Sequence, residues 1–193
     1  RTARALVSHR TAFDLDVVED CLRSTGVRFV PFDHAAYPRE FAQLTSPPAG
    51  LFLNGPERVW ATLIGSPRVT IVGTRSATGY GRRVAEELGG DFAGAGVVVV
   101  SGLARGIDAS VHSGALAAGG LTVAVLGTGP DVPYPRMNRR LFRDVAEKGV
   151  VVSEYPPGTA PAKWRFPARN RLMAALGNAV VVVEAGIPSG ALL

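Results

Sequence analysis

The sequence contains a single cysteine, Cys21, among 193 residues. One cysteine excludes an intrachain disulfide framework and a metal site built from several thiolates, and it favours a reducing, cytoplasmic environment. No uncharged apolar run approaches the roughly 20 residues that a membrane-spanning helix needs, and residues 1–10 lack the apolar segment of a secretory signal peptide. We therefore expect a cytoplasmic protein with no membrane contact.

Catalytic and metal-binding signatures are also scarce. The three histidines, His9, His34 and His112, are scattered, and none has a partner at metal-ligand spacing. Glu154 and Glu184 each follow an apolar run, but one carboxylate per loop without a nucleophile does not make a mechanism. The sequence thus predicts no catalytic residue, no metal site and no cofactor.

Charge is distributed unevenly along the chain. Residues 1–66 hold seven basic and seven acidic side chains, whereas the remainder holds fourteen basic and nine acidic ones and so carries the whole net charge of +5. The segment 136–171 alone has nine basic side chains against three acidic ones. A local excess of cations favours an anionic partner such as nucleic acid or a phosphorylated substrate.

Apolar runs alternate with helical stretches from residue 67 onward. Each run is nearly continuous in Val, Ile, Leu or Ala, as a strand covered on both faces requires. Strands that alternate with helices of this length are typical of right-handed crossovers and of a doubly wound, mostly parallel α/β sheet. The predicted strands are 69–72, 97–100, 121–126, 150–152 and 179–183, and the predicted helices between them are 80–94, 107–118, 138–148 and 167–176.

Residues 1–66 follow a different pattern. The predicted elements are helices 16–24, 37–44 and 57–64 and strands 27–30 and 50–54, with Pro47 and Pro48 as breakers. This segment is either a small α/β subdomain or a small N-terminal extension that adds to the main sheet. The expected division is therefore 1–66 for this segment and 67–193 for the main domain.

Ligands of an open α/β sheet bind beyond the carboxyl ends of its strands, so the loops after the predicted strands are the candidate site. The first loop, 73–81, places glycines and hydroxyls before a helix, which exposes backbone N–H groups to an anion such as a phosphate. Arg75 projects a cation there, and neither the dinucleotide fingerprint nor the Walker pattern fits. The alternative is a tight turn with a solvated arginine.

The second loop, 101–108, repeats this design. Ser101 can donate to a phosphate, and Asp108 is better suited to capping a helix N-terminus than to acting as a general base. The third loop, 127–135, is stiffened by prolines and can line a pocket, but it holds no nucleophile.

Cations and aromatic rings interleave in the fourth loop, Lys163-Trp164-Arg165-Phe166. Single-stranded nucleic acid is bound in this way, because cations follow the phosphates and rings stack on bases at about 1–3 kcal/mol per base. The other interpretation places the rings in the core and leaves the arginines solvated. Both remain open for Trp164, whereas Phe166, which precedes a proline at the start of a helix, is expected at the surface.

Taken together, these loops resemble the DNA processing protein A family, also called DprA or Smf. Four motifs in the family's order, at the ends of successive strands, are hard to obtain by chance. They are Ile71-Val72-Gly73-Thr74-Arg75 with Tyr80-Gly81, then Ser101-Gly102-Leu103-Ala104-Arg105-Gly106-Ile107-Asp108, then Phe166-Pro167-Ala168-Arg169-Asn170-Arg171, and finally Val183-Glu184-Ala185-Gly186 with Ser189-Gly190.

The resemblance implies an extended Rossmann-like fold, here truncated at its C-terminal end. It implies a non-catalytic homodimer that binds single-stranded DNA without sequence preference and delivers the RecA recombinase in natural transformation and recombination. Arg75, Lys163 and Phe166 match the family's strand-contacting positions. With the surrounding turns, the expected DNA- or phosphate-binding residues are Gly73, Thr74, Arg75, Tyr80, Gly81, Ser101, Gly102, Arg105, Gly106, Lys163, Phe166, Arg169, Asn170, Arg171, Ser189 and Gly190.

The alternative is a nucleotide-processing enzyme of the phosphoribohydrolase, lysine decarboxylase-like type, which resembles this chain in sheet topology and glycine loops. Those enzymes carry a P-G-G-x-G-T-x-x-E segment that supplies the catalytic carboxylate, and the corresponding stretch here, 184–190, lacks it. An NAD-dependent dehydrogenase is excluded because the dinucleotide fingerprint is missing and no acidic residue ends the second predicted strand.

Overall fold

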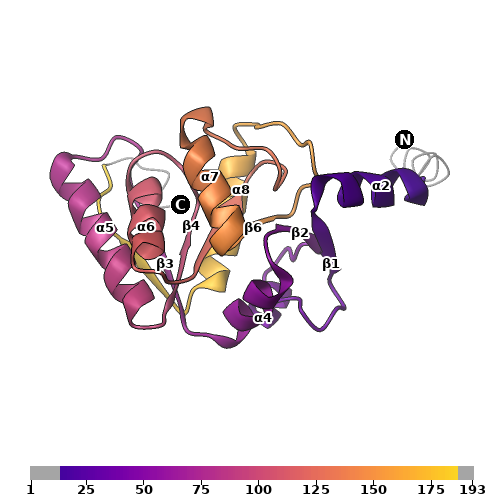
Figure 1. Cartoon of the computed structure of the whole chain (residues 1–193), viewed down its shortest axis with the longest axis horizontal. Coiled ribbons are helices and arrows are strands. Elements are labelled where there is room, and N and C mark those ends of the chain that lie inside the picture. Colours follow the sequence, from indigo (N-terminus) through magenta and orange to yellow (C-terminus); the bar gives the residue numbers. More distant parts are fainter. Residues whose placement is uncertain (1–13, 187–193) are drawn as a thin grey trace.

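A mixed seven-stranded sheet forms the centre of the molecule, with strand order β1-β2-β6-β5-β4-β3-β7 (Figure 1). The computed structural model describes residues 14–186. The strands are β1 (Arg28–Pro31), β2 (Gly50–Asn54), β3 (Arg68–Val72), β4 (Val98–Ser101), β5 (Thr122–Leu126), β6 (Val150–Ser153) and β7 (Ala179–Val182). The helices are α2 (Leu15–Thr25), α3 (Arg39–Ala42), α4 (Glu57–Gly65), α5 (Gly79–Gly94), α6 (Ile107–Ala117), the 3-10 turn η1 (Arg136–Asn138), α7 (Arg139–Lys148) and α8 (Arg165–Leu176).

The parallel part of the sheet is wound in two directions from β3. The chain steps outward through β4 and β5 to β6 by way of α5, α6 and α7, and α8 then returns it to β7 on the other side of β3. In the part of the sheet with the order β6-β5-β4-β3-β7, all neighbouring strands are parallel. The predicted doubly wound α/β fold is confirmed, and the carboxyl ends of β3 to β6 lie at one edge, as that topology requires.

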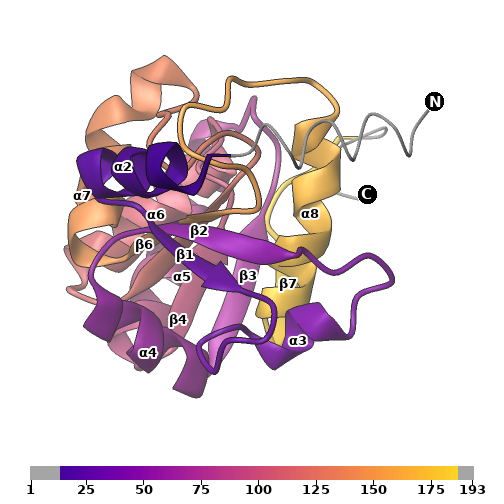
Figure 2. The same ribbon diagram turned by 90° about the vertical axis from the view of Figure 1, so that its right-hand side faces the viewer.

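Helices cover both faces of the sheet, because apolar strand residues point alternately to the two faces. Val98 and Val100 pack in one cluster with Leu172 of α8, whereas Val99 packs in another with Val111 of α6. Figure 2 shows α8 across the sheet from α6 and α7. No helix among residues 14–186 is long and apolar enough to cross a membrane.

Two strands from the N-terminal segment continue the same sheet. β2 pairs antiparallel with β6, and β1 pairs antiparallel with β2. Phe41 of α3 and Trp60 of α4 are buried in the core that also contains Leu172. The sheet is therefore continuous across the expected boundary at residue 66.

Arg68, at the start of β3, ties this N-terminal segment to the parallel core. Its buried guanidinium donates from Nε to the Leu176 carbonyl at 2.7 Å and from Nη1 to the Leu63 carbonyl at 2.9 Å. Its Nη2 pairs with the Glu40 carboxylate. One side chain thus links α8, α4 and α3, which fixes the face opposite α5 and α6.

Candidate nucleic-acid interface

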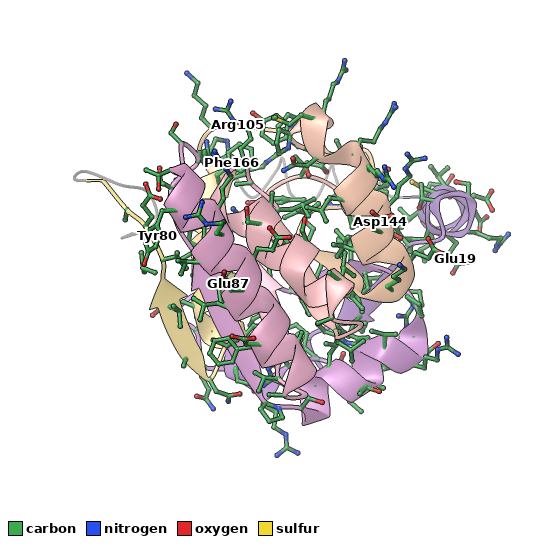
Figure 3. All side chains as sticks on the ribbon, turned by 60° about the vertical axis from the view of Figure 1, so that its left-hand side comes forward. Glu19, Tyr80, Glu87, Arg105, Asp144 and Phe166 are labelled. Atoms are coloured by element: carbon green, nitrogen blue, oxygen red, sulfur yellow. The ribbon has the colours of Figure 1, made fainter. Side chains whose placement is uncertain are left out.

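A pocket of about 300 Å³ lies at the carboxyl edge of the parallel strands. The segments that follow β3, β4 and β5 and the first turns of α8 all contribute to its wall, so residues far apart in the sequence meet there. Figure 3 shows Arg105 and Phe166 close together at this end of the molecule. The side chains that line it include Arg75, Arg105, Tyr134, Met137, Phe166 and Arg169.

The centre of the pocket wall is a stack of two aromatic rings and a guanidinium. The rings of Tyr134 and Phe166 are stacked, with centroids 5.2 Å apart and an interplanar angle of 26°. The Cζ atom of Arg75 lies 5.5 Å from the centroid of the Phe166 ring. Such cation–π contacts hold a guanidinium in place while its N–H donors remain free for a ligand. The side chain of Arg105, exposed at the same wall, adds a second cation.

Arg169 has a different position from the other predicted cations. Its side chain is buried, with 4% of the residue exposed. Nη1 donates to the carbonyls of Gly102, at 2.8 Å, and Val125, so the guanidinium joins the loop after β4 to the end of β5. Burial lowers the pKa of Arg169 to about 10, a nearby Asp108 opposes this shift, and the group stays charged at neutral pH.

The contact with Arg169 explains why position 102 is a glycine. A Cβ atom there would collide with the Arg169 guanidinium. Arg169 therefore forms part of the pocket lining and also fixes the loop that carries Arg105 through its hydrogen bond to the Gly102 carbonyl.

Asp108 completes this buried support. Its Oδ2 accepts a hydrogen bond from the Ala104 amide at 3.3 Å, within the loop that precedes α6. Burial raises the pKa of Asp108, and the charge of Arg169 opposes that shift. The carboxyl orders the loop of Arg105 through the backbone. It does not cap α6 as expected, because it lies inside the first turn of that helix, whose N-cap position, Gly106, has no side-chain cap.

The predicted phosphate site at the start of α5 is filled by a carboxylate of the chain itself. Glu184, just after β7, accepts hydrogen bonds from the Thr78 amide at 3.1 Å and the Thr78 hydroxyl at 3.0 Å. The Gly81 position is tight for the same reason, because a Cβ there would collide with Glu184. Tyr80 is 71% exposed and does not line the pocket. The amide that an anion would use here is thus already engaged.

Thr74 and its glycine neighbours shape the turn that presents Arg75. The Thr74 amide donates to the Glu184 carbonyl at 2.7 Å, and its Oγ1 accepts from the Ser76 amide at 3.2 Å. Gly73 packs against Ile107, and Gly106 takes a φ of 76° against the Thr74 carbonyl, where a Cβ would collide. Both glycines have a packing reason to be there.

Two of the residues expected to contact DNA make contacts within the protein. Ser101 is fully buried, and its hydroxyl donates to the Ile71 carbonyl at 2.7 Å, so it joins β4 to β3 and does not reach the pocket. Arg171 pairs with the Glu154 carboxylate, which offsets its charge. Asn170 lies partly buried between these arginines in α8, and Ser189 and Gly190 lie outside the described residues.

A second aromatic group lies at the start of α8. Trp164 is 63% exposed, and its ring meets Tyr155 edge-on at 6.1 Å between centroids. The Cζ atom of Arg165 lies 4.7 Å from the Tyr155 centroid and 5.2 Å from that of Trp164. Trp164 is therefore a surface residue and not a core anchor. Lys163 is also exposed.

Sequence reasoning missed Tyr134 as part of the site. The available signal was its place in the proline-rich loop after β5, which was expected to line a pocket. Among residues 14–186, no group of three or more His, Cys, Asp or Glu side chains is arranged to hold a metal ion. The site as described consists of guanidiniums and aromatic rings.

Comparison with known sequences identifies the family. Residues 28–193 match the model for DNA recombination-mediator protein A. The chain is 44% identical over 166 residues to protein Smf of Synechocystis sp., covering 86% of this chain and 42% of that protein. It is 49% identical over 145 residues to a putative DNA processing protein DprA of Mycobacterium tuberculosis, covering 75% of this chain and 36% of that protein. The chain thus spans less than half the length of these two relatives.

Solved structures show the same likeness. DNA processing protein A from Streptococcus pneumoniae superposes with a TM-score of 0.86 at 35% identity, over 96% of this chain and 63% of that one. The protein of the same name from Helicobacter pylori, studied for its single-stranded DNA binding mode, gives a TM-score of 0.76 at 30% identity, over 87% of this chain and 74% of that one. The resemblance drawn from the loop motifs is confirmed, and the chain belongs to the DNA recombination-mediator protein A family.

Proposed function

We propose that this chain binds single-stranded DNA without sequence preference and is the DNA-contacting part of a recombination mediator. The observation that carries the proposal is the stack of Tyr134, Phe166 and Arg75 beside the exposed Arg105. The single-stranded DNA binding of the Helicobacter pylori relative supports it.

The chemistry of the stack suits a single strand. Aromatic rings accept any unpaired base, because every base presents a π face, and guanidiniums bind the phosphates on either side. Arg75 is held against the Phe166 ring and Arg105 is carried on a loop that Arg169 and Asp108 fix. A preordered site of this kind loses less conformational entropy when the strand binds.

Three finer features belong to the same proposal. The chain acts without catalysis, forms a homodimer and delivers RecA to the bound strand. Membership of the family supports these roles. The stretch 184–190 lacks the P-G-G-x-G-T-x-x-E segment that supplies the catalytic carboxylate of the phosphoribohydrolases, so we expect no release of adenine from AMP.

The direct test is the affinity for a fluorescein-labelled oligo-dT, measured by anisotropy at fixed salt. Phe166→Ala is expected to weaken binding about 5- to 150-fold, which corresponds to the loss of about 1–3 kcal/mol of stacking. Arg75→Ala is expected to weaken binding and to lower its salt dependence. Arg58→Ala changes an exposed arginine of α4 and serves as the control.

Equal affinity of the Phe166→Ala variant and the wild type would overturn the assignment of this pocket. A blunt duplex of equal length is the second probe, because paired bases cannot stack on the rings. Equal binding to duplex and single strand would contradict the stacking argument.

A further inference from the structure

Four arginines form one stripe along η1 and α7. Arg136, Arg139, Arg140 and Arg143 are spaced at i, i+3, i+4 and i+7, so they lie on one side of a helical segment. We call these four residues the arginine stripe. All four are exposed, and within residues 14–186 none makes a side-chain hydrogen bond or ion pair.

The arginine stripe lowers the stability of the helix that carries it. Like charges three and four residues apart on a helix repel each other, and no acidic residue lies in the first turn of α7 to offset them. The acidic residues of α7, Asp144 and Glu147, come after the stripe and form no ion pair with it in the described residues. An uncompensated row of this kind is suited to an external anion.

The stripe begins where the pocket ends. Met137 of η1 lines the pocket, and it stands between the first two arginines of the stripe. Asn138 fixes this junction, because its Nδ2 donates to the carbonyls of Leu103 at 2.9 Å and Ala104 at 3.2 Å. The stripe is therefore held against the loop that carries Arg105. In Figure 3 several nitrogen-tipped side chains project outward near this end of α7.

We infer that the arginine stripe binds the phosphate backbone of the same single strand whose bases stack in the pocket. This inference rests on the proposed function. The stripe adjoins the pocket, so the same ligand can contact both. A surface with aromatic rings followed by a row of cations matches a single strand, which carries both bases and phosphates. From residue 136 to 143 the stripe is about 10 Å long at about 1.5 Å per residue, enough for two or three phosphates.

The test compares two double variants with the same change in charge. Arg140→Gln/Arg143→Gln removes the half of the stripe that lies farthest from the pocket. Arg39→Gln/Arg58→Gln removes two exposed arginines from α3 and α4, near the N-terminal part of the sheet. Gln has a helix propensity close to that of Arg, so both variants are expected to fold, which circular dichroism checks.

Affinity for oligo-dT is measured by anisotropy from 50 to 200 mM salt. Each phosphate contact with a single strand contributes about 0.7 to the slope of log K against log salt. The slope of the stripe variant is expected to be about 1.4 smaller. The ratio of wild-type to variant affinity therefore falls about sevenfold between 50 and 200 mM salt. The control variant is expected to keep the wild-type slope.

Oligonucleotide length gives an independent measurement. The affinity of the wild type is expected to rise over two or three nucleotides beyond the length at which the stripe variant reaches its plateau. The inference is overturned if the stripe variant matches the control in slope and length dependence. If that happens while Phe166→Ala still weakens binding, the proposed function stands without the stripe. If the wild type does not bind oligo-dT at all, the proposed function itself fails.

Discussion

The buried histidine His112 makes a prediction about acid stability that can be calculated. Its ring in α6 is fully buried, with Nδ1 2.7 Å from Thr122 Oγ1, and the Thr122 hydroxyl lies 2.8 Å from the Val99 carbonyl. Nε2 has no hydrogen-bond partner in residues 14–186. Burial, with a smaller contribution from the charge of Arg169, lowers the pKa of His112 from 6.5 to about 3.

The sign and size of the effect follow from proton binding. Below pH 6.5 the unfolded chain binds a proton at this residue while the folded protein does not, so stability falls as the pH falls. With these two pKa values the loss between pH 7 and pH 5 is about 2 kcal/mol. At pH 5 this figure depends on the ordinary pKa of histidine and hardly on the depressed one, as long as the latter stays below about 4.

The assay is urea unfolding of the wild type and His112→Asn at pH 7, 6 and 5. The variant is expected to be less stable at pH 7, because the smaller side chain leaves a cavity. The difference in the free energy of unfolding between the two proteins is expected to be about 2 kcal/mol smaller at pH 5 than at pH 7, since asparagine takes up no proton. Groups distant from His112 contribute nearly equally to both proteins and cancel in the comparison. A gap that stays constant with pH would refute the reasoning.

Two further predictions concern the pocket and its surroundings. Gly102→Ala places a Cβ against the Arg169 guanidinium, so we expect a loss of about 1–3 kcal/mol in a denaturant titration and weaker oligo-dT binding. Gly94→Ala, where a Cβ meets nothing within 4 Å, is the control and is expected to leave binding unchanged. Of the chain's two tryptophans, Trp60 is 2% exposed and Trp164 is 63% exposed. Oligo-dT should therefore quench the fluorescence of a Trp60→Phe variant but not that of Trp164→Phe, and equal quenching would contradict the surface assignment.

The fold was predictable because its signals are local. Parallel strands covered on both faces need continuous apolar runs, and the runs at 97–100 and 150–152 coincide with buried β4 and β6 to within one residue. The resemblance to the family assigned Arg75, Lys163 and Phe166 to contacts with the DNA strand, and of these Arg75 and Phe166 lie together in the pocket wall. The positions of the strands follow from neighbouring residues, and the grouping of the loops at one edge follows from the topology.

The roles of individual polar groups were not predictable in the same way. Arg169 and Lys163 are both cations in one basic segment, yet Arg169 is buried under carbonyls of Gly102 and Val125 whereas Lys163 is exposed. The carbonyls that remain free to accept from a buried arginine are determined by the relative positions of the ends of different strands. The local sequence pattern does not contain that information. For the same reason Ser101, small and polar after a strand, was expected at the ligand and is found between two strands.

The position of Glu184 gives a reason why the proposed interface lies beside the switch point of the sheet and not on it. In a doubly wound sheet the crevice where the crossovers diverge, here between β3 and β7, is the usual ligand site, and backbone amides at a helix start hold the anion. Glu184 takes the Thr78 amide with its carboxylate and the Thr74 amide with its carbonyl, so the chain itself supplies the anion there. The same two contacts stiffen the turn that presents Arg75. In the proposed interface, phosphates are therefore bound by exposed guanidiniums beside aromatic rings and not by the backbone amides at the start of α5, and these exposed groups leave room for a long strand.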